Sequence, residues 1–300
     1  MRSISSPLFI EALGKRLPVH VRGNGLLSLL VLGPATLFEK PGFIPAAWDE
    51  QFTIYFVDFF ALSERSSSCH YDCLQLEDFV GAVESTRAQL QLDTVVLFGH
   101  SAAGVLAMEY STRYPDRVLF NILLCASPIW GGYKNKLTTD FFQQNASHRR
   151  HRLFMRDQRR LHKIDRVSFV HSYNARRAYF YKYPRQMFWQ NLWDHVVLDE
   201  PLVNRYFSLI QNFDFRAIAY HTQTFLALGL YDASCPFYMW TDDVAAMLEN
   251  IEYYVFPDSG HYPMLEEWQA LTIQLRAYID RHDFQRCMLS VTDQSLLRAV

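Results

Sequence analysis

The stretch Val96-Leu-Phe-Gly-His-Ser-Ala-Ala-Gly104 places Ser101 in a turn of small residues directly after an apolar run. The run Val95–Phe98 is typical of a buried strand, and Val105–Tyr114 has the pattern of an amphipathic helix. A sharp turn from strand to helix around a serine, with small residues two positions before and after it, is the pattern of a nucleophile elbow. We therefore predict that Ser101 is lifted out of a sheet and faces the positive end of a helix.

Short apolar runs alternate with helical patterns along most of the chain. Two runs at 9–13 and 17–22 flank a Gly-Lys pair and predict a hairpin at the start. Further strands are predicted at Leu26–Leu32, Phe52–Asp58, Phe120–Cys125, Thr224–Gly229 and Ile251–Phe256, and helices at Leu76–Leu90, Thr241–Leu248 and Glu266–Arg281. This alternation predicts an α/β fold with a mostly parallel central sheet flanked by helices.

A change of composition sets one segment apart. Between Gly131 and Leu198 the chain has 14 Lys and Arg against 4 Asp and Glu, although the net charge of the whole chain is −2. No strong strand pattern appears in that segment, and a break of this kind marks a separate structural unit. The sequence thus predicts three parts: a first part of the core at 1–130, an inserted helical lid at 131–220 and a second part of the core at 221–300.

Composition also limits the class of protein. A charge near zero argues against a general nucleic-acid binder. No apolar stretch approaches the roughly 20 residues of a membrane-spanning helix, so we expect no integral membrane segment. Five scattered cysteines argue against a disulfide framework and favour a reducing, cytoplasmic location.

Two segments downstream of Ser101 supply the partners that a nucleophilic serine needs. A serine hydroxyl reacts well only when a base removes its proton and a third group orients that base. Asp232 follows the apolar run 225–230, and His261 stands in a loop after the run 251–256. We predict a catalytic triad of Ser101, Asp232 and His261, each just beyond the carboxyl end of a strand. Asp258 is the alternative acid.

The motifs of this region form a set: Gly99-His-Ser-Ala-Ala-Gly104, Tyr114-Pro-Asp-Arg-Val118, Gly229-Leu-Tyr-Asp232 with Pro236, and Ser259-Gly-His261 with Pro263. Together they resemble the α/β-hydrolase superfamily, and the chain is similar to its proline iminopeptidase-like, lidded branch. The resemblance covers most of residues 8–130 and 222–281. It implies the α/β-hydrolase fold and hydrolysis by a serine nucleophile, with no metal and no organic cofactor.

An oxyanion hole needs two N–H donors directed at the developing negative charge. One is expected from the backbone of Ala102, the residue after the nucleophile. The other is expected from the loop Val31-Leu-Gly-Pro-Ala35, where members of the family usually have His-Gly-x. Pro34 has no N–H, so we assign the second donor to Gly33.

The substrate is less well defined by the sequence. We expect Trp130, His100 and Trp189 to contact a small-molecule substrate, Trp130 because it stands just past a strand end. The segment 131–198 is basic, whereas an aminopeptidase needs carboxylates to hold an α-ammonium group. A neutral or anionic substrate is therefore expected, and the basic side chains are open to a second interpretation as a solvated helix face.

Three functions agree with these residues. Hydrolysis of an ester, amide or lactone through an acyl-serine intermediate is the first. The second is a catalytically weak scaffold that acts as a binding or signalling protein, suggested by the unusual loop at 31–35. The third is an acyltransferase with the same triad. A dehalogenase or epoxide hydrolase with an aspartate nucleophile is disfavoured, because residue 101 is serine.

Overall fold

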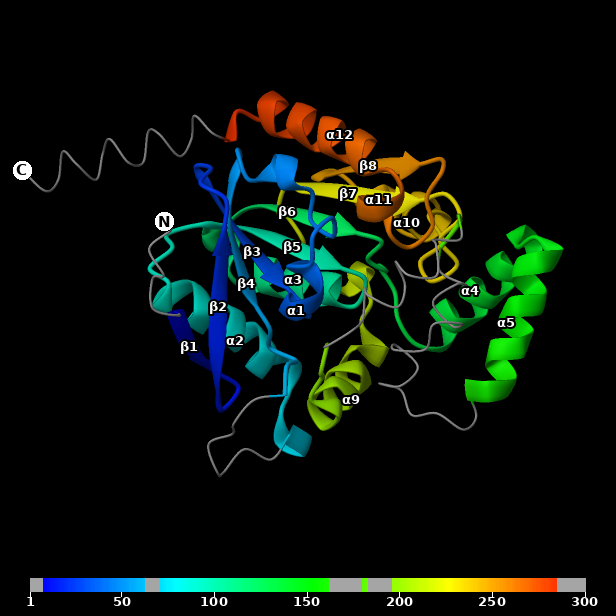
Figure 1. The fold of residues 1–300 in the computed structure, drawn as a ribbon, viewed down its shortest axis with the longest axis horizontal. Helices are drawn as coiled ribbons and strands as arrows, with labels where there is room; N and C mark the ends of the chain where they lie inside the picture. The colour runs from blue at the N-terminus through cyan, green and yellow to red at the C-terminus, as the bar shows by residue number, and fades with distance from the viewer. Residues whose placement is uncertain (1–7, 63–70, 162–179, 183–195, 285–300) are drawn as a thin grey trace, which may run out of the picture.

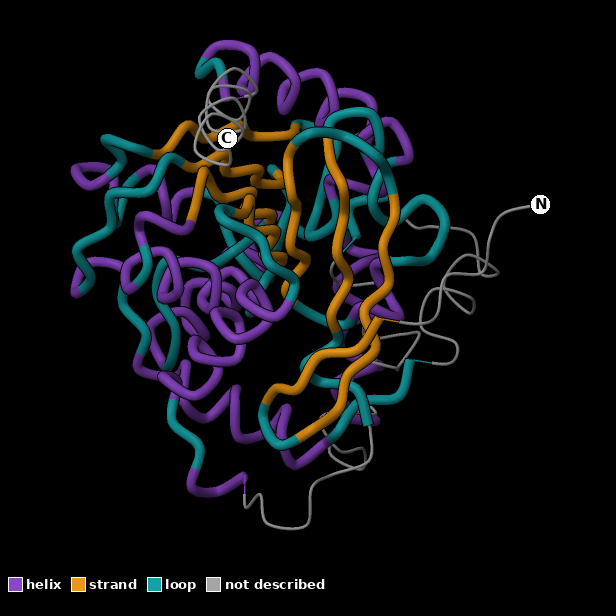
Figure 2. Tube along the Cα trace, turned by 90° about the vertical axis from the view of Figure 1, so that its left-hand side faces the viewer, coloured by secondary structure: helices purple, strands orange, loops and turns teal. Residues whose placement is uncertain are grey.

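An eight-stranded sheet lies at the centre of the molecule, in the order β1-β2-β4-β3-β5-β6-β7-β8. This structure is a computed structural model, and it describes residues 8–62, 71–161, 180–182 and 196–284. The strands are β1 Leu8–Ala12, β2 Lys15–Arg22, β3 Leu27–Leu32, β4 Phe52–Val57, β5 Val95–His100, β6 Val118–Leu124, β7 Thr224–Gly229 and β8 Ile251–Phe256. Strands β1 and β2 are antiparallel to their neighbours, whereas β3 to β8 run parallel. The sheet forms a twisted band with helices around it (Figure 2).

The helices follow the strands in alternation. They are α1 Ala35–Phe38, α2 Leu76–Gln89, α3 Ala103–Arg113, α4 Gly132–Asn145, α5 His148–Leu161, α9 Glu200–Leu209, α10 Tyr238–Thr241, α11 Pro263–Glu266 and α12 Trp268–Arg281. In Figure 1, α12 covers one face of the sheet, and α2 and α3 cover the other. None of these helices is long and apolar enough to span a bilayer.

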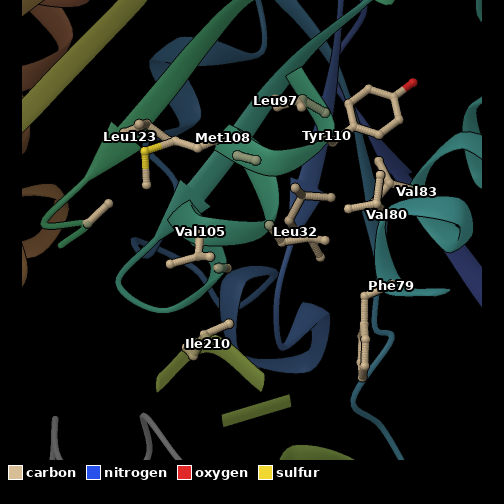
Figure 3. Close-up of a cluster of buried hydrophobic side chains, with 14 of the residues drawn as sticks. Leu32, Phe79, Val80, Val83, Leu97, Val105, Met108, Tyr110, Leu123 and Ile210 are labelled. Carbon is tan, nitrogen blue, oxygen red and sulfur yellow. The ribbon is translucent and has the colours of Figure 1, made fainter. Parts of the chain in front are cut away.

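Side chains at alternate positions of a strand fill two hydrophobic cores. Leu30 and Leu32 of β3 belong to the core that includes α2 and α3, while Leu29 and Val31 belong to the core that includes α12. This alternation follows from the pleat of a strand, and burial on both faces explains why the central parallel strands are largely apolar. Figure 3 shows part of the first core, with Met108 of α3 drawn near Leu123 of β6.

The predicted fold class is confirmed, and the predicted strands agree with the observed ones to within two residues. The predicted helix Thr241–Leu248 is wrong. Helix α10 ends at Thr241, and only a 3₁₀ turn at Ala245–Met247 follows. Polar side chains at the end of α10 form other hydrogen bonds instead: the Thr241 hydroxyl donates to the neighbouring Asp242, and Asp243 accepts from the Tyr133 hydroxyl of α4.

The segment between β6 and β7 contains α4, α5 and α9. Figure 1 shows α4 and α5 beyond the arrowheads of the strands, at the carboxyl end of the sheet. A buried ion pair attaches α9 to the core: Lys15 Nζ lies 2.9 Å from Asp199 Oδ2, and neither side chain is exposed. The Tyr71 hydroxyl donates to the same oxygen at 2.6 Å. Because Asp199 directly precedes α9, this contact fixes where that helix begins over the sheet.

Candidate active site

The turn around Ser101 is a strained junction between β5 and α3. Ser101 has a φ of +56°, a left-handed conformation that non-glycine residues rarely adopt. Its N–H donates to the carbonyl of Leu124 at the end of β6 (3.0 Å), and its carbonyl accepts from the N–H of Gly104 (3.0 Å). Two backbone hydrogen bonds therefore hold the serine at the carboxyl end of the sheet.

Two glycines allow this junction to close. A Cβ atom added at Gly99 would lie 2.8 Å from the Cα of Gly104 and 2.9 Å from the carbonyl oxygen of Ala103. A Cβ added at Gly104 would lie 2.3 Å from the Cβ of Ala126. Helix α3 thus lies too close to β5 for a side chain at Gly99, and too close to Ala126 after β6 for one at Gly104, as expected for a nucleophile elbow.

Asp232 and His261 form a buried pair at the ends of β7 and β8. His261 Nδ1 lies 2.8 Å from Asp232 Oδ2, and the two side chains are 7% and 0% exposed. The other carboxylate oxygen accepts from the N–H groups of Ser234 at 2.7 Å and Cys235 at 3.0 Å. With one oxygen held by the backbone, Asp232 is oriented to accept from the imidazole and to fix its tautomer.

His100 links this pair to the serine turn. His100 Nε2 lies 2.9 Å from the carbonyl oxygen of His261, and the two rings are 4.8 Å apart between centroids. Burial and repulsion by His261 lower the pKa of His100 to about 3, so its imidazole is neutral and donates to that carbonyl. Because His100 directly precedes Ser101, this bond holds the histidine loop beside Ser101.

The alternative acid, Asp258, is placed differently. It is exposed, and its Oδ2 lies 3.1 Å from Lys182 Nζ. The imidazole of His261 instead meets Asp232. The geometry therefore favours Asp232 as the partner of the histidine.

Glu266, to which the sequence assigned no role, joins three backbone amides. Its Oε1 accepts from Tyr181 at 3.0 Å and Lys182 at 3.1 Å, and its Oε2 accepts from Gly260 at 2.7 Å. Burial raises the pKa of this carboxyl to about 7, although the hydrogen bonds to it act in the opposite direction. Since Gly260 precedes His261, Glu266 ties the insertion to the histidine loop.

Residues 180–182 also stack on the loops that carry the triad candidates. Phe180 lies on Tyr262, with 4.5 Å between ring centroids, and Tyr181 lies on Tyr231 at 3.8 Å. Tyr262 follows His261 and Tyr231 precedes Asp232 in the chain. Residues 180–182 thus pack against both the loop of Asp232 and the loop of His261.

The two predicted oxyanion donors lie at neighbouring strand ends. Leu32 pairs with Gly99 in the register of β3 and β5, so Gly33 stands next to the serine turn. Gly33 has a φ of +138°, and an added Cβ would lie 2.7 Å from the ring of Phe38. Ala102 is the N-cap of α3, and its carbonyl accepts from the Tyr206 hydroxyl of α9 at 2.9 Å. Their role in binding an oxyanion stays a prediction.

Asp58 supports the loop that carries Gly33. It lies buried at the end of β4, accepts from the Thr36 hydroxyl at 3.3 Å and accepts from the N–H of Phe60 at 3.1 Å. Burial raises its pKa to about 6, and the hydrogen bonds from Thr36 and Phe60 oppose that shift. Asp58 therefore helps to hold the start of α1, directly after the loop that carries Gly33.

The predicted substrate contacts have different surroundings. Trp130 is half-buried between the core and α9, where its ring meets Phe207 at 5.9 Å. His100 is 8% exposed and packs edge-on against Phe38 and Phe43. Trp189 lies outside the described residues. Contact of these three with a substrate stays a prediction.

Three side chains around the Asp232–His261 contact are of the types that commonly bind metal ions. Single ligand atoms of Cys125, Asp232 and His261 lie within 4.8 Å of one another. Burial and the charge of Asp232 raise the pKa of the Cys125 thiol, which opposes the thiolate form that a metal requires. His261 Nδ1 is already bound to Asp232. These donors fit acid–base chemistry better than metal binding.

Comparison with known proteins places this geometry in context. The sequence profile of the Alpha/beta hydrolase family matches residues 20–274. The AB hydrolase superfamily protein YclE of Bacillus subtilis is 26% identical over 280 residues, which span 89% of this chain and 96% of that protein. A 70-residue stretch, 22% of this chain and 19% of the other, is 41% identical to the human 1-acylglycerol-3-phosphate O-acyltransferase ABHD5. Among solved structures, an esterase from Exiguobacterium antarcticum superposes with a TM-score of 0.63 at 21% identity, covering 92% of this chain and all of that one.

Proposed function

Since the chain belongs to the alpha/beta hydrolase family, we propose that it is a serine hydrolase that cleaves an ester, amide or lactone through an acyl-serine intermediate. The observation that carries this proposal is the buried 2.8 Å contact between Asp232 and His261, beside a serine in a left-handed turn. Nucleophile, base and orienting acid are recognised by such roles and geometry rather than by position in the sequence.

In the proposed mechanism, His261 acts first as a base and then as an acid. Asp232 accepts from Nδ1–H, which leaves Nε2 with a lone pair to take the proton from the Ser101 hydroxyl. The serine oxygen bonds to the substrate carbonyl carbon, and the carbonyl electrons move to its oxygen. Collapse of this tetrahedral species expels the leaving group, which receives the proton from His261. Water then attacks the acyl-serine by the same route, and Ser101 is regenerated.

The negative oxygen of the tetrahedral species needs two donors. We assign them to the N–H groups of Ala102 and Gly33, because the register of β3 and β5 sets both beside Ser101. Loss of one such donor typically costs about 3 kcal/mol of transition-state stabilisation. The hydrogen bond of Tyr206 to Ala102 supports this arrangement by fixing the N-cap residue of α3.

We propose that residues 131–220 form a lid over this site and that residues 1–130 and 221–300 form the core. Helices α4 and α5 lie at the carboxyl end of the strands, and residues 180–182 brace the acid and histidine loops. The basic composition of this segment favours a neutral or anionic small-molecule substrate. Weak activity on proline arylamides is expected even though the motifs resemble the iminopeptidase-like branch. The cysteine content favours the cytoplasm.

A substrate panel tests this function. Purified protein is assayed with p-nitrophenyl esters, lactones and aminoacyl arylamides, each with wild type and Ser101→Ala. We expect ester or lactone cleavage by wild type and at least a thousandfold lower rate in the variant. Equal rates in the two proteins, with both folded, would contradict the role of Ser101. No turnover and no covalent labelling of folded wild type would favour the binding scaffold instead.

Acyl transfer is the second candidate, because the partial relative ABHD5 bears an acyltransferase name. The acyl-serine would then pass its acyl group to an alcohol rather than to water. Adding glycerol or methanol to the ester assay separates the two. If the ester of the added alcohol is the main product at millimolar alcohol, the protein is a transferase. If the free acid is the main product, it is a hydrolase.

A further inference from the structure

A buried lysine near the proposed site has no ion pair with any of the described residues. Lys134 lies in the first turn of α4 and is 8% exposed. Its ammonium stands 3.8 Å from the centre of the Trp130 ring. In the part of the chain that the structure describes, no carboxylate forms an ion pair with it. A cation–π contact alone compensates little of the cost of burying an ammonium group.

The position of Lys134 in its helix adds to this cost. The first turn of a helix carries a partial positive charge, so a cation there is repelled and an anion is attracted. The first turn of α4 contains no acidic residue, and the N-cap Gly131 provides no side-chain cap. Burial lowers the pKa of Lys134, and the charges of Cys235 and Asp232 only partly oppose it. The local field therefore favours an added negative charge.

Trp130 supplies a second unused donor. Its indole Nε1 is buried and has no hydrogen-bond partner among the described residues. A buried indole N–H usually finds an acceptor, because leaving it without one costs about 1–3 kcal/mol. Within the described residues, Trp130 thus presents a buried N–H without an acceptor, and the ammonium of Lys134 stands against the same ring.

Contacts on both sides place this pair beside the proposed site. The ring of Trp130 meets Phe207 of α9, and the preceding residue Tyr206 donates to the carbonyl of Ala102. On the other side, Lys134 interacts electrostatically with Asp232 and Cys235. The pair, at the start of the inserted segment, therefore lies between α9, which contacts the serine turn, and the loop of Asp232.

We propose that Lys134 and Trp130 bind a carboxylate group of the substrate, so that the enzyme prefers esters whose acyl part ends in an anion. The two oxygens of a carboxylate match the two donors, and a single negative charge neutralises the single ammonium. This inference rests on the proposed function for the identity of the ligand as substrate, whereas the anion site itself does not depend on Ser101.

Another buried cation, Arg150 of α5, is a weaker candidate. It lines a cavity of about 140 Å³ together with Tyr181 and Tyr231. Glu266 lies close enough for the charge of Arg150 to lower the pKa of its carboxyl. The charge of Asp232 acts on Lys134 in the same way, so the choice of Lys134 rests on the indole N–H of Trp130 beside it, which has no acceptor among the described residues.

The first test compares two substrates of similar length, p-nitrophenyl hemisuccinate and p-nitrophenyl butyrate. The ratio of their kcat/KM values measures the preference for the carboxylate. We expect Lys134→Met to lower this ratio tenfold or more, and Trp130→Phe, which keeps the ring but removes the N–H, to lower it about fivefold. Lys136→Met removes the same charge from an exposed position of α4 and is expected to leave the ratio unchanged.

The second test measures binding without catalysis. Monomethyl succinate is titrated calorimetrically into Ser101→Ala protein, with and without Lys134→Met, and at least tenfold weaker binding is expected in the double variant. An unchanged ratio and unchanged binding would overturn the carboxylate site even if Ser101-dependent ester cleavage is found. Lys134-dependent binding in a protein that cleaves no ester would support the site and overturn the proposed function. Binding of inorganic phosphate in preference to the succinate ester would also overturn the carboxylate assignment.

Discussion

Replacing Glu266 by Gln removes the buried carboxylate that ties residues 180–182 to the histidine loop. Glutamine keeps a carbonyl oxygen for the N–H groups of Tyr181 and Lys182, but its amide cannot accept from Gly260. That lost acceptor lowers stability by about 1–3 kcal/mol at every pH. The substitution also changes how the unfolding free energy depends on pH, and this change is what the experiment measures.

The magnitude follows from the shift of the pKa of Glu266 from 4.5 to about 7 on burial. The folded-state value lies above the unfolded one, so folding binds a proton in this range. The stability that protonated Glu266 contributes to the folded state is fully present below pH 4.5 and is lost as the pH rises through 7. Linkage gives about 3 kcal/mol in total, of which about 2.5 kcal/mol is lost between pH 5 and pH 8.

Urea unfolding of wild type and Glu266→Gln at pH 5, 6, 7 and 8, in one buffer series at constant ionic strength, measures this difference. Wild type should lose about 2.5 kcal/mol more stability than the variant between pH 5 and pH 8. The pH-independent cost of the lost acceptor cancels in that comparison. Parallel curves for the two proteins would refute the account of Glu266 as a buried carboxylate protonated near neutral pH.

Three further perturbations test the elbow, the attachment of α9 and the loop of Gly33. Gly99→Ala forces a Cβ against backbone atoms, so it should lower the unfolding free energy by at least about 2 kcal/mol and remove most of the activity. The control Gly81→Ala places a Cβ in open space on α2 and should stabilise the protein by up to about 1 kcal/mol in the same thermal melts. Lys15→Met leaves Asp199 buried without its cation and should cost about 3–5 kcal/mol by urea unfolding; a loss below 1 kcal/mol would contradict the buried pair. Burial raises the pKa of Asp58 from 3.8 to about 6. Between pH 5 and pH 8, wild type should therefore lose about 1 kcal/mol more unfolding free energy than Asp58→Asn. Equal losses in the two proteins would contradict this.

The sheet could be predicted from the sequence because its strands are short apolar runs between turn signals. Strands β7 and β8 match the predicted runs at 224–229 and 251–256 residue for residue. Burial on both faces makes such strands visible as continuous apolar sequence. The positions of Asp232 and His261 followed from these strand ends, and the structure brings the two side chains to 2.8 Å.

Other features depend on contacts between distant residues and leave no local pattern. Glu266 reads as one more acidic residue near the start of a helix, and only the arrival of residues 180–182 makes it a buried link. Lys134 belongs to a basic segment whose charge is visible in the sequence. Its ammonium stands against the nearby Trp130 ring, but the carboxylate of Asp232 that acts on it comes from a loop far away in the chain. Tertiary packing, rather than composition, distinguishes it from its exposed neighbour Lys136.

Covalent labelling by a fluorophosphonate tests the central claim most directly, because only an activated serine reacts rapidly with such a reagent. Folded wild type, Ser101→Ala and Asp232→Asn are treated with the reagent and digested, and the adduct is located by mass spectrometry. The account predicts one stoichiometric adduct on Ser101 in wild type, none in Ser101→Ala and much slower labelling in Asp232→Asn. An adduct on a different serine, or none in folded wild type, would contradict Ser101 as the nucleophile.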